Sequence, residues 1–177
     1  CRNTIHFSNN IKRSMKLNLA SGQMYLKGYV NIDNKSMYHG NMKIDKEADI
    51  FTLEWENNTV EEIVLSHFAM YIGYKDMSAL LSKWYGWLKP EGRIIIETGN
   101  VKFIAQHILD NESPDEINGP NGVMQLFGWE TTAGHKWAWC PETIGKLMFD
   151  SGFKDVEVGD GHFHNNPKRD FLIVGTK

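Results

Sequence analysis

Seven short apolar segments alternate with helical patterns along this chain, and this order constrains the fold more than any other feature of the sequence. The segments lie at residues 15–20, 28–33, within 42–49, 60–66, 93–98, 153–158 and 170–176. Their residue types and flanking turns are typical of β-strands. The centre of 60–66 is apolar enough for burial on both faces of a sheet. Strands that alternate with helices indicate an α/β fold with a largely parallel sheet.

Two amphipathic helices are expected from apolar residues at helical spacing. The first spans 76–88, with Asp76 as its candidate cap and a Lys-Pro pair as its stop. The second spans 141–151, with a proline in its first turn and Gly152 just past its end. A further helical pattern lies near 103–109.

The last strand is expected to run antiparallel to the others. Parallel neighbours need a crossover of a dozen or more residues, usually a helix. The connection between the last two strands has no convincing helical pattern.

Composition and charge exclude several classes of protein. The chain has 177 residues, the size of one domain, and 41% hydrophobic with 23% charged residues is a globular composition. A net charge of −3 and a pI of about 6.2 give no sign of a nucleic-acid partner, which usually requires a clustered basic face. No apolar run reaches the roughly 20 residues of a membrane-spanning helix.

The ends of the chain and its two cysteines bear on its context. Cys1 and Cys140 are too few for a disulfide framework, so a reducing compartment, the cytoplasm, is expected. Residues 1–14 are polar and are expected to form an N-terminal arm before a single domain at 15–177. The chain starts with Cys rather than Met, so we expect that an upstream segment has been removed and leave open whether the chain is a fragment. The oligomeric state is left open.

Three strand ends carry groups suited to a nucleotide-like ligand. In an open parallel sheet, ligands bind outside the carboxyl ends of the strands. Asn18–Gly22 is a small-residue turn that lets backbone N–H groups approach a ligand. Asp33 ends the second strand and can accept both hydroxyls of a ribose. Asp49, followed by Ile50-Phe51, suits the amine and ring of an adenine. Alternatively, the same residues are an ordinary strand-to-loop turn, a capping aspartate at position 33 and a surface aspartate at a loop start at position 49.

These motifs, in this order, resemble class I S-adenosylmethionine (SAM)-dependent methyltransferases. The similarity is to the small subgroup whose first motif reads roughly L-N-L-G-C-G. Leu17–Gly22 reads L-N-L-A-S-G, and Gly28–Asp33 reads G-Y-V-N-I-D where the family has G-W-x-N-I-D. Asp49–Ile63 is similar to the family's D-x-x-x-L-P-F-x-D-x-S-F-D-E-I segment, and Ser66-His67 matches its S-H pair. Leu88–Arg93 matches its L-K-P-G-G-x turn. Cys140–Ile144 and Ser151–Phe153 are similar to its closing helix and to the exit from that helix.

The resemblance implies a fold, a cofactor and a set of binding residues. The fold is a Rossmann-like, doubly wound, mostly parallel seven-stranded sheet with an antiparallel last strand. The usual first helix must be abbreviated or absent because the connection at 22–29 is short. The cofactor is SAM. The implied contacts are Asn18, Ala20, Ser21 and Gly22 to its methionine part, Asp33 and Asn34 to the ribose, Asp49 and Ile50 to the adenine, and Ser66 and His67 below the transferring methyl.

The sequence departs from the family pattern at two places. Ala20 stands where the family has glycine and puts a methyl group beside the cofactor path. Met70-Tyr71 replaces the common Glu-His after the fourth strand, so no acid–base pair transfers to those positions.

Two histidines are candidate catalytic bases. An oxygen acceptor usually requires a base, and His is the usual candidate near neutral pH. His67 ends the fourth strand and His135 precedes the closing helix, although either can be a hydrogen-bonded structural residue instead. His162 and His164 form an H-x-H pair, but zinc generally needs three or four ligands and no further set is evident. No metal site is therefore expected.

Residues 99–139 are expected to form a lid or specificity insert, because they are long for a structureless connection. Aromatic residues there suit an apolar or sugar-stacking wall, or alternatively a small satellite core: Phe127, Trp129, Trp137 and Trp139. Nearby acids and amides suit a polyhydroxylated ligand. Together they favour a small-molecule or glycan acceptor over a protein or nucleic acid.

Three functions follow as hypotheses. The first is a SAM-dependent methyltransferase that moves a methyl group to an oxygen or nitrogen of a small molecule or saccharide. The second is a catalytically weak or inactive SAM-binding or scaffold domain of a larger protein, suggested by Ala20. The third, a nicotinamide-dependent oxidoreductase, lacks the G-x-G-x-x-G turn that opens a helix at the pyrophosphate site.

Overall fold

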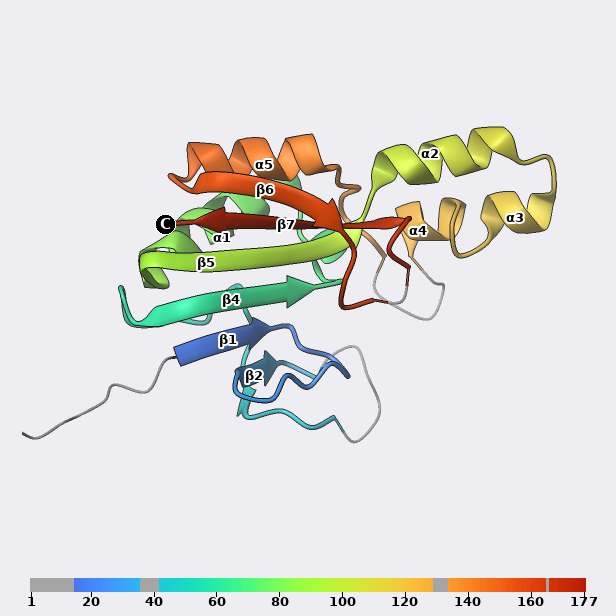
Figure 1. The fold of residues 1–177 in the computed structure, drawn as a ribbon. Coiled ribbons are helices and arrows are strands. Elements are labelled where there is room, and N and C mark those ends of the chain that lie inside the picture. Colours follow the sequence, from blue (N-terminus) through green and yellow to red (C-terminus); the bar gives the residue numbers. More distant parts are fainter. Residues whose placement is uncertain (1–14, 36–41, 129–133, 165) are drawn as a thin grey trace, which may run out of the picture.

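One seven-stranded sheet runs through the molecule in the order β3-β2-β1-β4-β5-β7-β6 (Figure 1). The structure is a computed structural model that describes residues 15–35, 42–128, 134–164 and 166–177. The strands are β1 (Met15–Leu19), β2 (Val30–Asp33), β3 (Lys46–Glu47), β4 (Val60–Ser66), β5 (Leu88–Gly99), β6 (Lys154–Asp160) and β7 (Asp170–Thr176). The helices are α1 (Tyr74–Trp87), α2 (Val101–Asp110), α3 (Pro114–Asn118), α4 (Val123–Phe127) and α5 (Pro141–Asp150), with a 3₁₀ turn η1 (Ala69–Tyr71).

β7 runs antiparallel to both of its neighbours, β5 and β6, whereas the pairs from β3 across to β5 are parallel. This confirms the expected α/β fold with a mostly parallel seven-stranded sheet and an antiparallel last strand. Asp170, the first residue of β7, pairs with Gly99, the last residue of β5. The start of β7 therefore lies at the same edge as the carboxyl ends of the parallel strands.

Helices α1 and α5 pack on the sheet through one hydrophobic core. Each buries the apolar residues that recur at helical spacing in its sequence. Their partners are alternate residues of the central strands, which point to one face of the sheet. The core includes Met77, Leu81 and Trp84 of α1, Ile144 and Met148 of α5, and Leu17, Leu19, Ile63, Leu65, Ile94, Ile96 and Ile173 of the strands.

The two predicted helices begin and end close to their expected bounds. α5 starts at Pro141, and Gly152 follows it with a φ of 101°, a conformation that favours glycine. α1 starts two residues earlier than expected, with Gly73 as its N-cap. The expectation that Asp76 caps α1 was therefore wrong, because Asp76 lies within its first turn.

Side-chain hydrogen bonds replace a helix between β1 and β2. Residues 20–29, all of them described, form turns and no helix. Asn31 accepts from the backbone N–H of Leu26 at 2.8 Å and donates to the carbonyls of Leu26 and Tyr29. Asn18 donates to the Met24 carbonyl at 2.7 Å and to Asn31. These bonds satisfy backbone groups that a helix would otherwise pair, and the abbreviated first helix is confirmed.

β5 begins earlier than predicted. Val60 of β4 pairs with Leu88, and Glu62 pairs with Arg93, so the register shifts between them. The turn that the resemblance implies at Leu88–Arg93 is thus an irregularity inside the strand rather than a connection before it.

The segment after β5 lies beyond the carboxyl ends of the parallel strands (Figure 1). It contains α2, near the expected pattern, and two five-residue helices, α3 and α4, which the sequence did not predict. Residues 129–133 of the expected insert and the expected arm at 1–14 lie outside the described residues. That 99–139 acts as a lid stays a prediction. None of the described helices has the length and apolar character needed to cross a membrane.

Candidate functional site

A cavity of about 290 Å³ opens at the carboxyl ends of β1, β2 and β4. Its walls come from segments far apart in the sequence: Ala20, Ser21, Gln23, Met24, Asp33, Asn34, Ser66, His67, Phe68, Tyr71, Phe163 and His164. The structure thus brings together six of the predicted cofactor residues, Ala20, Ser21, Asp33, Asn34, Ser66 and His67. Asn18, Gly22, Asp49, Ile50 and His135 lie outside the lining.

Asp33 joins the first motif to the second strand. Its Oδ2 accepts the backbone N–H of Gly22 at 2.9 Å, and its Oδ1 accepts that of Lys35 at 2.6 Å. An ionised carboxylate offers about four lone-pair sites, so both oxygens retain acceptor capacity towards the cavity. The carboxylate is held in place while it remains able to accept hydroxyl groups.

Two buried polar atoms of the first motif have no hydrogen-bond partner among the described residues, Ser21 Oγ and Asn18 Oδ1. Ser21 is 4% exposed and lines the cavity. An unpaired buried polar group costs about 1–3 kcal/mol. A polar ligand that bonds the Ser21 hydroxyl would remove this cost, so the first motif fits a ligand with polar groups at this place.

Two residues of the cavity have left-handed backbone conformations without being glycine. Ala20 has a φ of 49° and His67 a φ of 51°. Such conformations cost about 1–3 kcal/mol and persist only where the surroundings impose them. In His67 the turn is fixed by its backbone N–H, which donates to the Glu97 carbonyl at 2.9 Å. The turn leaves the imidazole in the cavity wall.

Asp49 and Ile50 lie away from this cavity. Asp49 Oδ1 accepts the backbone N–H of Phe51 at 2.9 Å, which suits an aspartate at the start of a loop, the alternative that the sequence left open. Ile50 is 3% exposed and belongs to the hydrophobic core. Their contact with an adenine stays a prediction.

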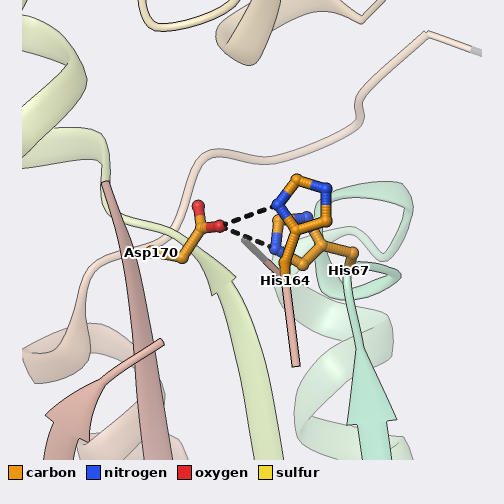
Figure 2. Close-up of side chains that lie close together, drawn as sticks. All are labelled: His67, His164 and Asp170. Carbon is orange, nitrogen blue, oxygen red and sulfur yellow. Dashed lines mark hydrogen bonds and ion pairs between the residues drawn. The ribbon is translucent and has the colours of Figure 1, made fainter. Parts of the chain in front are cut away.

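The rings of His67 and His164 lie close together, tilted by 34°, and both contact one carboxylate oxygen of Asp170 (Figure 2). The ring centroids are 4.0 Å apart. His67 Nε2 lies 3.0 Å from Asp170 Oδ2, and His164 Nδ1 lies 3.2 Å from the same oxygen. The three residues come from the end of β4, the β6–β7 connection and the start of β7.

Arg169 holds Asp170 in its charged form. Its Nε donates to Oδ1 at 2.7 Å and its Nη2 to Oδ2 at 2.9 Å. Burial raises the pKa of Asp170, but hydrogen bonds from His67 and Arg169 and their charges outweigh it and hold that pKa well below its ordinary value. Asp170 is therefore an acceptor only throughout the neutral range.

Glu97 fixes the connection that carries His164. This carboxylate, fully buried near the end of β5, accepts the backbone N–H groups of His162, Phe163 and His164. Three donors satisfy its charge inside the protein. The position of His164 over His67 is therefore set by the sheet itself.

The group of His67, His164 and Asp170 also has the composition of a metal site. Its three candidate ligand atoms lie within 4.8 Å of one another. The sequence analysis paired His164 only with His162 and found no such set. However, Arg169 Nη2 donates to His164 Nδ1 at 3.0 Å and so occupies the lone pair that a metal would need.

His135 lies behind the cavity wall. Its Nδ1 contacts the Gln125 carbonyl at 2.9 Å, and its ring packs edge-on against Tyr71, which lines the cavity. Burial lowers the pKa of His135, the hydrogen bond with Gln125 raises it, and the neighbouring His67 lowers it further. Its catalytic role stays a prediction.

The aromatic residues of the insert divide between surface and core. Trp139 is 1% exposed and donates to the Ala69 carbonyl, so it forms part of the core. Trp137 and Phe127 are exposed, at 44% and 69%. Trp129 lies outside the described residues.

Sequence reasoning missed Asp170, Arg169 and the role of His164 beside His67. A signal was present, since Arg169-Asp170 places two charges at the entry of a strand that is otherwise apolar. Buried charges are usually paired, so two adjacent charges at the start of an apolar strand indicate a buried, paired group there. At the start of an antiparallel last strand, such a group lies at the ligand edge, the edge of the sheet formed by the carboxyl ends of the parallel strands.

Solved methyltransferases share this fold. The chain is similar to a SAM-dependent methyltransferase from Archaeoglobus fulgidus, with 16% identity, 94% of this chain and 87% of that chain covered, and a TM-score of 0.63. One from Mesorhizobium loti has 12% identity, 94% and 93% coverage and a TM-score of 0.63. Human N-acetylserotonin methyltransferase in complex with SAM has 17% identity and a TM-score of 0.57, with 94% of this chain and 48% of that chain covered.

No protein-family model matches the sequence, and no curated protein matches it. The likeness therefore lies in the fold, which is that of SAM-dependent methyltransferases.

Proposed function

We propose that this chain binds SAM and transfers its methyl group to an oxygen or nitrogen of a small-molecule or saccharide acceptor. One observation carries the proposal: the first-motif turn and Asp33 are bridged by a hydrogen bond at one cavity on the ligand edge of a methyltransferase fold.

The residues around the cavity fit the parts of the cofactor. Asp33 accepts the ribose hydroxyls, and the Ala20–Gly22 turn with the unpaired Ser21 hydroxyl receives the amino-acid end. Phe68, Tyr71 and Phe163 supply apolar walls that exclude water from the reacting atoms.

The protein's own task is to orient the acceptor and take its proton. When bound, SAM supplies an activated methyl group; as an acceptor O–H or N–H attacks, the sulfur takes the S–C electron pair and the acceptor proton is released. His67, in the wall of the cavity, receives that proton. Orientation of the reactants can lower the activation free energy by up to about 7–11 kcal/mol, so we expect alignment to supply most of the rate enhancement.

Calorimetric titration with SAM and with S-adenosylhomocysteine tests the proposal. We expect binding by the native chain, and an increase in Kd of roughly tenfold to hundredfold in Asp33→Ala, because hydrogen bonds to a charged group contribute about 1.5–3 kcal/mol each. Asp150→Ala, which removes an exposed carboxylate on α5, is the matched control and should bind as the native chain does. Failure of millimolar SAM to bind the native chain would refute the proposal.

An inactive SAM-binding domain is the second candidate, favoured by the strained Ala20 in the first motif. Incubation with methyl-labelled SAM and a fractionated cell extract distinguishes the two, since incorporation of label into any fraction excludes an inactive domain. Titration with NAD under the same conditions tests the oxidoreductase hypothesis, for which we expect no binding.

A further inference from the structure

The charged form of Asp170 fixes where His67 carries its proton. An ionised carboxylate cannot donate, so the 3.0 Å hydrogen bond between Asp170 Oδ2 and His67 Nε2 requires the hydrogen to be on Nε2. In neutral His67 the other nitrogen, Nδ1, is then a bare acceptor. Within the part of the chain that the structure describes, Nδ1 has no hydrogen-bond partner, and the ring lines the cavity.

Arg169 fixes the proton of His164 in the same way. His164 Nδ1 lies 3.0 Å from Arg169 Nη2, which can only donate, and 3.2 Å from Asp170 Oδ2, which already accepts from His67 and Arg169. We take the shorter contact as the hydrogen bond, and it requires Nδ1 to be unprotonated. Neutral His164 therefore carries its hydrogen on Nε2. Burial is the largest cause that lowers the pKa of His164, the carboxylate of Asp170 raises it, and the net lowering favours the neutral form.

The two rings consequently present opposite groups to the cavity. His67 Nε2 and His164 Nδ1 both face Asp170 (Figure 2), and His164 Nδ1 also faces Arg169. His67 therefore offers the acceptor Nδ1, and His164 offers the donor Nε2–H. The ring centroids are 4.0 Å apart and both residues line the cavity, so we infer that one small group can contact both rings.

We propose that Asp170 and Arg169 are positioning residues that make His67 and His164 a receptor for a hydroxyl group, which is the methyl acceptor. The hydroxyl donates its hydrogen to His67 Nδ1 while its oxygen accepts from His164 Nε2–H. During transfer the proton moves to Nδ1, leaving an imidazolium that Asp170 stabilises, and then leaves to water. An alkylammonium group has no lone pair for His164, so the site excludes protonated amines.

The assignment of the hydroxyl group as the methyl acceptor rests on the proposed function. The positions of the protons on His67 and His164 can be measured without cofactor or substrate. Long-range proton–nitrogen NMR spectra of the histidine-labelled full chain report which nitrogen of each ring carries hydrogen. At neutral pH we expect Nε2–H for both His67 and His164 in the native protein. His107 on α2, remote from this group in sequence, is an internal reference.

Two variants test separately whether Asp170 fixes the proton of His67 and whether Arg169 fixes the proton of His164. In Asp170→Asn, His67 should change from the single Nε2–H form to a mixture in which Nδ1–H is populated. In Arg169→Met, His164 should gain the Nδ1–H form, because its Nδ1 then faces only a carboxylate. Asp160→Asn, an exposed change at the end of β6, should alter neither ring. The backbone amide spectrum of each variant verifies that it is folded.

The spectra distinguish the hydroxyl receptor from an ammonium site and from a metal centre. If native His67 carries hydrogen on Nδ1, or if Asp170→Asn is folded with His67 unchanged, the positioning role is overturned. If native His164 carries hydrogen on Nδ1, both cavity-facing nitrogens are acceptors, which suits an ammonium and overturns the hydroxyl assignment. Stoichiometric broadening or shifts of both rings on titration with Zn²⁺ or Fe²⁺ at micromolar concentrations would overturn the proposal in favour of a metal centre.

Binding of S-adenosylhomocysteine keeps the two proposals distinct. Asp170→Asn should retain the native Kd within about twofold, because Asp170 is outside the cavity lining that we assign to the cofactor. Lack of cofactor binding by the native chain would remove the proposed function and leave the measured proton positions intact.

Discussion

Ala20 occupies a backbone conformation that suits glycine better than alanine. Its φ of 49° costs a non-glycine residue about 1–2 kcal/mol. The greater freedom of glycine in the unfolded chain offsets about 0.4–1 kcal/mol of this cost. We predict that Ala20→Gly raises the free energy of unfolding by up to about 1 kcal/mol, within those limits. Urea denaturation measures it, and SAM affinity should not fall, because the change only removes a methyl group from the cavity wall.

The matched control should change the free energy of unfolding in the opposite direction. Ala79→Gly, at an exposed position within α1, should lower the free energy of unfolding by about 1 kcal/mol. If Ala20→Gly destabilises the protein as much as Ala79→Gly does, the strain at position 20 is not real.

At the residue scale, the sequence predicted the groups that lie at strand ends and missed those that meet across the sheet. Asp33 and His67 follow β2 and β4 directly, so their position at the ligand edge could be inferred from chain order. The partnership of His67 with Asp170 joins residues 103 positions apart. Such a contact depends on strand order and register, which the residues themselves do not reveal.

Among the elements, the β6–β7 connection depends on one carboxylate of β5. Glu97 accepts three backbone N–H groups from residues 162–164. We predict that Glu97→Gln lowers the free energy of unfolding by about 2–4 kcal/mol, because bonds to a charged acceptor are each worth about 1.5–3 kcal/mol and the amide keeps only part of them. Hydrogen exchange should accelerate at 162–164 before it does in the centre of β7.

An exposed glutamate provides the control for this prediction. Glu157→Gln, on the edge strand β6, should change stability by less than about 0.5 kcal/mol. Equal effects of the two substitutions would show that Glu97 does not anchor the connection.

The elements themselves were predictable where periodicity extends over several turns or alternations. β4 and β7 have their expected bounds, and α5 differs by one residue. The five-residue helices α3 and α4 are too short to show a helical period, and their caps have no side-chain hydrogen bond that a sequence signature would announce. Helices this short depend on tertiary packing rather than on local preference.

For the whole molecule, we predict a loss of stability as the pH falls below about 6.5, the ordinary pKa of histidine. Burial is the main cause that lowers the pKa of both His135 and His164 in the folded protein. The unfolded chain therefore takes up protons at a higher pH than the folded one does. The free energy of unfolding therefore decreases as the pH falls from the pKa of these histidines in the unfolded chain to their lower pKa in the folded protein.

Urea denaturation at pH 7.5, 6.5 and 5.5 measures this dependence, and His135→Gln should reduce its slope. Asp170 and Glu142, whose pKa values are lowered, contribute only at more acidic pH, so they do not account for a decline in this window. A free energy of unfolding that stays constant or rises from pH 7.5 to 5.5 would contradict the prediction.

The reversed direction of β7 determines which of its ends contributes a residue to the contact between His67 and Asp170. A parallel final strand of seven residues would put its first residue at the opposite rim, roughly 20 Å away. Because β7 instead enters at Asp170, the residue that begins the closing strand is also the one that pairs with His67, so any opening of this end of β7 also breaks that pair.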